Sequence, residues 1–153
     1  MRLLASTDFA LRILMRLAVE PPDRPLTVET LARELGGLSR NHLHKVVQEL
    51  AASGVVRTVR GARGGVLLAV PPKEVRLGTL IRQLEADQVT VECFRADGGG
   101  CSLTPGCRLR GMLGVAWDSF LQSLDGNTLA DCVPNGVLPG VVAAPPPNAA
   151  RSL

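Results

Sequence analysis

The spacing of apolar residues changes near residue 55, and this change constrains the fold more than any other feature. Before it, apolar residues recur at intervals of three and four, which predicts helices over residues 5–20, 28–35 and 40–52. After it, the runs VVRTV and GVLLAV flank RGARGG, which predicts a two-stranded hairpin over residues 55–70 with a basic tip. Three helices followed by a hairpin are typical of a winged helix-turn-helix.

The residues at the expected helix ends support this order. Thr27 and Ser39 are predicted N-caps, and residues 6–8 supply a cap and a first-turn acid for the first helix. Gly36 and Gly37 form the expected turn between the second and third helices, and Gly54 ends the third.

A long helix is predicted from residue 108 to about 124, after a shorter one over residues 77–86. Its apolar residues cover so much of the circumference that it must be buried on more than one side. In so small a chain we expect a second subunit to provide that cover, as a two-fold homodimer. The apolar positions are Leu109, Met112, Leu113, Val115, Ala116, Trp117, Phe120, Leu121 and Leu124.

The expected fold class is therefore mainly α with a small β-hairpin wing, a winged helix-turn-helix with a long C-terminal dimerisation helix. We expect a DNA-binding domain over residues 1–75, a loop and dimerisation helix over 76–132, and a flexible tail rich in Pro, Ala and Gly over 133–153. No apolar run approaches the roughly 18 residues of a membrane span. Charged residues interrupt the apolar N-terminus, so we expect a folded helix in a cytoplasmic protein rather than a signal peptide.

The positive charge is concentrated in one part of the chain. Residues 36–70 contain five basic residues and one acidic residue, whereas residues 71–153 contain seven and eight. A local positive field suits a polyanion such as double-stranded DNA, although an ordinary solvated surface is the alternative. We find no nucleophile–base pair and no phosphate-binding loop, so we do not expect an enzyme.

The third helix has the composition of a recognition helix. An arginine can bridge a guanine edge and an asparagine an adenine edge in the major groove, while Ser39 suits a helix cap and a phosphate contact. Arginines and glycines of the hairpin tip can approach the minor groove or phosphates. The alternative is an ordinary polar helix face. The candidate DNA contacts are Ser39, Arg40, Asn41, His42, His44, Lys45, Gln48, Arg57, Arg60, Arg63 and Gly64.

Three cysteines, Cys93, Cys101 and Cys107, share a glycine-rich loop with the spacing C-x7-C-x5-C. Reduced thiols favour metal binding or redox chemistry over disulfides. Zinc sites usually contain closer pairs, C-x2-4-C, whereas a four-iron cluster needs four external ligands, three of which these thiolates could supply. We favour a [4Fe–4S] cluster, with [2Fe–2S] possible; zinc with one further ligand and metal-free redox thiols are the alternatives.

Five segments together resemble the NsrR family of nitric-oxide-sensing repressors, which is related to the iron–sulfur regulator IscR. The segments are STDFALRIL, LSRNHLHKVVQELAASG, VRGARGG, CSLTPGCRL and NTLADCV, and the resemblance covers residues 1 to about 135. It implies a homodimeric repressor whose cluster, held by the three cysteines, is required for binding operator DNA. It also implies that nitric oxide nitrosylates the cluster and releases the DNA.

The resemblance further implies that Asp8 of the partner subunit is the remaining cluster ligand. The alternative role of Asp8 is an acid favoured at a helix N-terminus. Two features depart from the family: the first cysteine gap is longer, and Cys132 stands where an aliphatic residue is expected, so we interpret it as a small buried hydrophobe. Two other functions stay open, an IscR-like sensor of cluster supply or redox state, and an iron–sulfur scaffold or electron carrier.

Overall fold

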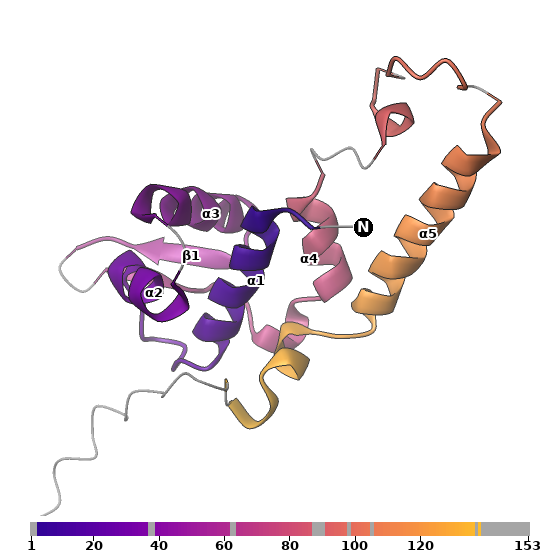
Figure 1. Ribbon diagram of the computed structural model, residues 1–153. Coiled ribbons are helices and arrows are strands. Elements are labelled where there is room, and N and C mark those ends of the chain that lie inside the picture. The colour runs from indigo at the N-terminus through magenta and orange to yellow at the C-terminus, as the bar shows by residue number, and fades with distance from the viewer. Residues whose placement is uncertain are drawn as a thin grey trace, which may run out of the picture.

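The computed structural model describes residues 3–36, 39–61, 64–86, 91–97, 99–104, 106–136 and 138. Three helices lead into an antiparallel hairpin, and two further helices follow (Figure 1). The predicted fold class, mainly α with a small wing, is confirmed. The elements are α1 (Ala5–Ala18), α2 (Val28–Leu35), α3 (Arg40–Ala52), β1 (Val56–Val59), β2 (Gly65–Leu68), α4 (Leu77–Leu84) and α5 (Arg108–Asp125), with 3-10 turns at Pro72–Glu74, Glu92–Phe94, Leu129–Cys132 and Pro134–Gly136.

The caps of α2 and α3 are those that the sequence predicts. Thr27 Oγ1 accepts a hydrogen bond of 3.1 Å from the Thr30 amide, and Ser39 Oγ accepts one of 3.4 Å from the His42 amide. The predicted side-chain cap of α1 is wrong, because Leu4 is the N-cap residue and makes no such bond. The helix begins early enough to carry Thr7 into the interior, and Asp8 lies in the first turn as expected.

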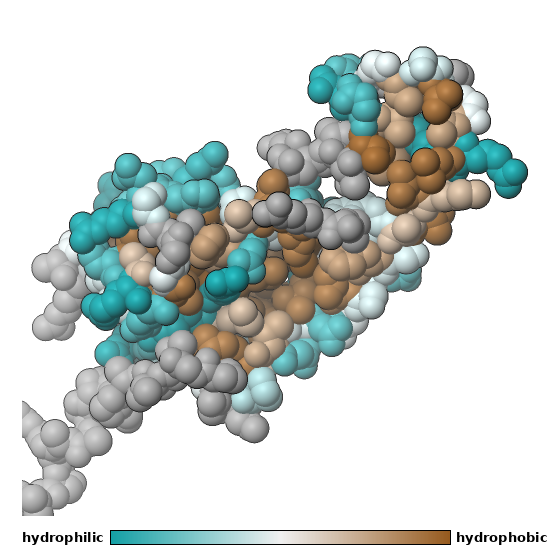
Figure 2. Space-filling view, in the orientation of Figure 1, coloured by the Kyte–Doolittle hydropathy of each residue, from teal (hydrophilic) through white to brown (hydrophobic). Residues whose placement is uncertain are grey.

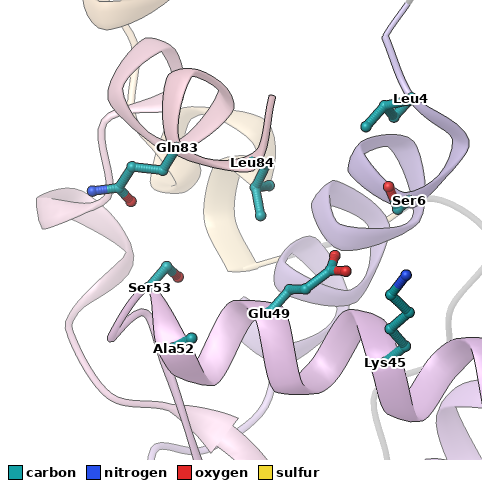
Figure 3. Close-up of a pocket in the computed structure, with 8 residues that line it drawn as sticks. All are labelled: Leu4, Ser6, Lys45, Glu49, Ala52, Ser53, Gln83 and Leu84. Carbon is teal, nitrogen blue, oxygen red and sulfur yellow. The ribbon is translucent and has the colours of Figure 1, made fainter. Parts of the chain in front are cut away.

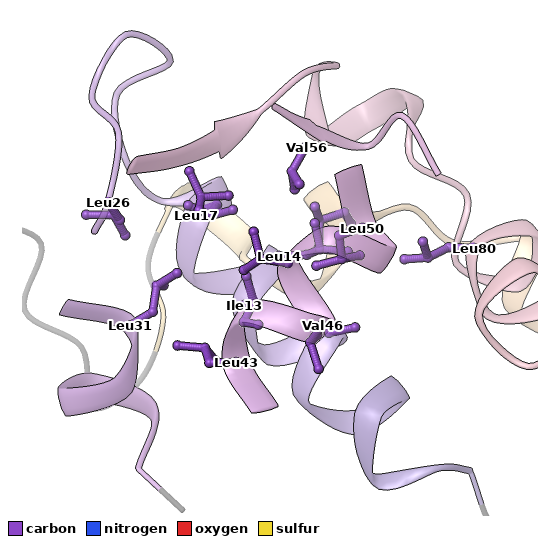
Figure 4. Packing of buried hydrophobic residues seen from close by; sticks show 14 of the residues in the cluster. Ile13, Leu14, Leu17, Leu26, Leu31, Leu43, Val46, Leu50, Val56 and Leu80 are labelled. Carbon is purple, nitrogen blue, oxygen red and sulfur yellow. The ribbon is translucent and has the colours of Figure 1, made fainter. Parts of the chain in front are cut away.

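The core joins α1, α2, α3, the hairpin and α4 (Figure 4). Aliphatic side chains fill it, each contributing roughly 1.5–3 kcal/mol on full burial. The side chains at its centre include Ile13, Leu14, Leu31, Leu43, Val46, Leu50, Val66, Leu80 and Leu129. This core fixes the orientation of α3 relative to the wing.

The wing is a four-residue ladder in which Val56 pairs with Leu68 and Val59 with Gly65. Val56 and Val66 point into the core, while Arg57 and Thr58 are exposed. A backbone bridge from Leu26 to Val66, with bonds of 2.9 and 2.8 Å, anchors the second strand to the loop before α2.

Helix α5 packs on α4 at its C-terminal end and extends away from the winged-helix body (Figure 1). Gly78 permits the contact, since a Cβ atom there would collide with the Leu121 carbonyl oxygen. Asp125 Oδ1 accepts bonds of 2.6 Å from the Thr79 amide and 3.0 Å from its hydroxyl. Among the residues of α5, all of which the structure describes, Leu121 alone is buried.

Candidate DNA-binding face and cysteine loop

The outer face of α3 is polar because its apolar residues all turn inward. Leu43, Val46, Val47 and Leu50 are buried, so the residues between them face solvent. Arg40 lies 3.7 Å from the Glu29 carboxylate, but both side chains are largely exposed and the pair is weak. The exposed residues are Ser39, Arg40, Asn41, His42, His44, Lys45 and Gln48.

The wing carries further basic side chains, and its strand β1 packs against α3. Arg57 and Arg60 are exposed, whereas the predicted contact Arg63 lies outside the described residues. At Gly64 the structure shows a role in the turn: its amide donates to the Gly61 carbonyl at 2.9 Å, and a Cβ atom would collide with the Val59 carbonyl.

An open pocket of about 600 Å³ connects α3 with the start of α1 and the end of α4 (Figure 3). Lys45 and Glu49 extend toward it from α3, and Gln83 and Leu84 line it from α4. Side chains of α3 and residues at the start of α1 therefore line the same pocket. The lining residues are Leu4, Ser6, Lys45, Glu49, Ala52, Ser53, Gln83 and Leu84.

A buried carboxylate joins α1 and α4 beside this pocket. Glu85 is 8% exposed and accepts a hydrogen bond of 2.9 Å from the Leu4 amide, one of the donors that a helix N-terminus leaves unsatisfied. Because Glu85 directly follows α4, this bond fixes the start of α1 relative to the segment that leads into the cysteine loop.

Asp8 lies one turn into α1 and is half-exposed. Its Oδ2 atom is 2.7 Å from Arg12 Nη2, whose guanidinium lies 5.3 Å from the centre of the Phe9 ring. Solvent screens this pair, so it contributes about 1 kcal/mol or less. The carboxylate is therefore accessible to a second molecule.

The cysteine loop precedes α5. Cys93 is buried in the turn Glu92–Phe94, Cys101 and Cys107 are half-buried, and all three are free thiols. Cys107 is the N-cap residue of α5. Arg110 Nε donates to the Cys93 carbonyl at 2.8 Å and so connects the first and last cysteine segments.

Hydrogen bonds also change the pKa of the Cys101 thiol. The Leu103 amide, assisted by Thr104, lowers the pKa of the Cys101 thiol below its ordinary value. Nearby, Glu92 Oε1 accepts a bond of 3.2 Å from the Gly100 amide and Asp97 Oδ1 accepts one of 3.0 Å from the Gly99 amide. By contrast, burial and then Asp131 raise the pKa of Cys132, which is half-buried rather than buried as expected.

The three cysteine thiols are the type of ligand that an iron–sulfur cluster requires. All three are free, and one of them accepts a hydrogen bond from a backbone amide, as the sulfur ligands of such clusters do. Within the described residues, no three His, Cys, Asp or Glu side chains lie close enough together to hold a metal ion, so the loop would have to close around the group. Asp8 is likewise not gathered with the cysteines of its own chain.

Sequence reasoning missed Glu85, Arg110 and Glu92. Their partners are 81, 17 and 8 residues away, and no local pattern indicates such bonds. The described helices include none long and apolar enough to cross a membrane.

The chain is similar to known transcriptional regulators in sequence and in fold. The family model Rrf2, described as an iron-dependent transcriptional regulator, matches residues 3–135. A Halalkalibacterium halodurans protein named HTH-type transcriptional regulator NsrR is 38% identical over 135 residues, covering 88% of this chain and 92% of its own. CymR, the global cysteine regulator of B. subtilis, is 26% identical with a TM-score of 0.64, covering 86% of this chain and 95% of its own. T. potens IscR shares the fold, with a TM-score of 0.64, 24% identity and coverage of 86% and 85%.

Proposed function

Because this chain belongs to the Rrf2 family of iron-dependent transcriptional regulators, we propose that it is a repressor that releases operator DNA in response to nitric oxide. Relatives named NsrR, such as the one from Halalkalibacterium halodurans, support the choice of signal. A family of transcriptional regulators is not a family of enzymes, and membership disfavours the scaffold or electron-carrier interpretation. The observation that carries the proposal is the cysteine loop, which lies at the free end of a helix that the described residues leave largely uncovered.

The uncovered face of α5 supports a homodimer. Leu109, Met112 and Val115 are 58%, 59% and 68% exposed, and they share one face of the helix. Figure 2 shows hydrophobic residues at the surface along α5. A second copy of α5 is the natural cover, because a two-fold axis places the same apolar face on both partners.

Antiparallel pairing would also complete the site. Helix α5 has 18 residues and spans roughly 27 Å, with the cysteine loop at one end and the winged-helix body at the other. A two-fold axis across the helix therefore brings each loop beside the body of the other subunit. Asp8 of the partner subunit is a half-exposed carboxylate on that body.

In this arrangement Cys93, Cys101, Cys107 and the partner's Asp8 would hold the cluster, with [4Fe–4S] favoured and [2Fe–2S] as the alternative. The group would supply iron able to react with nitric oxide, and a carboxylate is a harder ligand than a thiolate. The chain's own residues then transmit the state of the loop. Arg110 couples it to α5, and Glu85 couples the end of α4 to the start of α1.

These couplings reach the DNA-binding face. Helix α1 packs against α3, so we expect a shift at the start of α1 to move the recognition helix. We expect Arg40 and Asn41 to read base edges and the remaining candidates on α3 and the wing to contact phosphates. A coupling of roughly 1–3 kcal/mol would change operator affinity about 5–150-fold.

Cysteine variants test the ligand set. Cys101→Ser and Cys107→Ser, purified anaerobically, should lose most of the iron and sulfide per chain and should lose tight DNA binding. Cys132→Ser is the matched control and should retain both. Full cluster loading in Cys101→Ser or Cys107→Ser would refute the assignment.

Asp8 needs a separate test. Asp8→Ala should still fold, because the Asp8–Arg12 pair is exposed. We expect its cluster to respond to nitric oxide at a different rate. The same cluster with an unchanged response would remove Asp8 from the mechanism.

A further inference from the structure

A second cavity, of about 380 Å³, lies at the far end of α1 from Asp8. It is lined by the end of α1, the loop that follows, both strands of the wing and the segment after β2. Its volume is within the range of small-molecule sites, and its lining is mostly apolar with a few polar groups, as such sites usually are. The lining residues are Leu17, Ala18, Glu20, Pro21, Pro22, Arg24, Arg57, Leu67, Leu68, Ala69, Val70, Pro71 and Pro72.

The carboxylate of Glu20 is the unusual feature of this cavity. Its side chain is only 3% exposed, and Oε1 lies 2.7 Å from Arg16 Nη1, which is equally buried. Arg16 Nε in turn lies 2.6 Å from Glu34 Oε2. Glu20 Oε1 thus belongs to the group of ion pairs that connects α1 with α2, although neither Oε1 nor Arg16 Nη1 has a hydrogen-bond partner within the described residues.

The second oxygen of Glu20, Oε2, faces a second arginine. It lies 3.7 Å from Arg24 Nη1, which is too far for a hydrogen bond. Within the described residues, neither Glu20 Oε2 nor Arg24 Nη1 has a hydrogen-bond partner. A buried carboxylate oxygen and a buried guanidinium nitrogen without partners are costly, although the Arg24 side chain as a whole is 40% exposed. The cavity therefore presents an adjacent pair of unsatisfied atoms.

The charges select the class of ligand. A simple anion would form ion pairs with Arg24 and Arg57, but the Glu20 carboxylate would repel it. A simple amine would form an ion pair with Glu20, but the two arginines would repel it. A zwitterion can donate from an ammonium group to Glu20 and accept from the arginines through a carboxylate, which are strong charge-assisted bonds. The apolar remainder of the cavity suits an apolar side chain.

We propose that this cavity binds a free α-amino acid with an apolar side chain. The ammonium group contacts Glu20 Oε2, and the carboxylate contacts Arg24 and Arg57. The side chain lies among Leu17, Leu68 and Val70. This proposal is independent of the cluster and of the signal that the regulator senses.

Isothermal titration calorimetry of the full chain with L-leucine tests the proposal. Two analogues separate the charges: 4-methylpentanoate lacks the ammonium group, and isopentylamine lacks the carboxylate. We expect one leucine per chain and at least roughly tenfold weaker binding of each analogue, the factor that one lost charged contact of about 1.4 kcal/mol represents. No binding of leucine at millimolar concentration, or equal binding of either analogue, would overturn the proposal.

Variants locate the binding. Arg24→Gln removes a donor from a side chain that is 40% exposed, so the fold is retained, and leucine should bind at least roughly tenfold more weakly. Ala18→Phe should fill the cavity and abolish binding without changing a charge. Arg33→Gln is the matched control, since Arg33 is 71% exposed, faces Glu34 and does not line the cavity. Unchanged affinity in Arg24→Gln would place any bound leucine elsewhere and refute the assignment.

Discussion

At the scale of single residues, local chemistry was predictable and distant chemistry was not. Thr27 and Ser39 were identified as caps because a cap needs only its own side chain and an amide three residues ahead. Glu85 was missed because its partner, Leu4, is 81 residues away. The cysteines were found from their spacing, but spacing does not say how their sulfur atoms meet.

The arginines of α3 and of the wing should affect DNA binding differently. Arg40→Ala should relax preference at one base pair by roughly 1–3 kcal/mol, because an arginine at the start of a recognition helix reads a base edge. Arg60→Ala should weaken binding to all sequences and reduce the slope of log K against log salt by about 0.9, because a phosphate contact releases about one counterion. Titrations of matched duplexes at several salt concentrations measure both effects. Identical behaviour of the two variants would contradict the division into base and phosphate contacts.

The thiols should differ in reactivity in the cluster-free protein. The pKa of Cys101 is lowered by the Leu103 amide, so its thiolate, the reactive form, persists to lower pH than that of an ordinary cysteine. The pKa of Cys132 is raised by burial, so its thiolate forms only at higher pH. Alkylation with iodoacetamide, followed by mass spectrometry, should therefore modify Cys101 before Cys132 at neutral pH. Faster modification of Cys132 would show that the hydrogen bonds to Cys101 are wrong.

At the scale of elements, apolar periodicity predicted the helices and the hairpin well. The long helix was expected over residues 108–124 and is observed as Arg108–Asp125. The direction in which it leaves the body was not predictable, because it depends on the close approach of Gly78 to Leu121 and on the bonds between Asp125 and Thr79. Periodicity shows which face of a helix is buried but not what the helix packs against.

Gly78→Ala should separate α4 from α5. The added Cβ atom would collide with a backbone carbonyl that cannot move alone, so we expect a loss of about 1–3 kcal/mol in the free energy of unfolding. Gly114→Ala is the control on α5, where a Cβ atom would make only an ordinary contact of 3.9 Å with Phe94 Cζ. It should leave stability unchanged or raise it by up to about 1 kcal/mol through helix propensity. Urea denaturation of both variants measures the difference, and equal midpoints would contradict the packing.

At the scale of the whole molecule, the sequence predicts that α5 needs a partner, and among the described residues Leu121 is the only residue of α5 that is buried. The fold of the body follows from one chain, because its core is closed by α1, α2, α3, the hairpin and α4. The cysteine site does not follow in the same way, because the proposed fourth ligand belongs to a second subunit. The geometry of the cysteine site, which depends on dimer formation in this proposal, is therefore the feature that the sequence of one chain defines least.

Val115→Glu should dissociate the dimer. Val115 is 68% exposed in the single chain, so a charge there should not disturb the fold, but it would be buried unpaired in a paired α5. Sedimentation equilibrium should show a dimer for the wild type and a monomer for the variant at the same concentration. Thr58→Glu adds the same charge on the exposed wing and should remain dimeric. A dimeric Val115→Glu protein would move the interface away from this face.

We propose that an intact cluster is required for operator binding and that nitric oxide, by reacting with the cluster, abolishes this binding. The measurement is an anaerobic titration of the cluster-bearing dimer against a duplex selected from random sequences by that same form, before and after addition of a nitric oxide donor. We expect the affinity for the duplex to fall about 5–150-fold after the nitric oxide donor is added, while the protein remains dimeric. Unchanged affinity after complete reaction of the cluster with nitric oxide would contradict it.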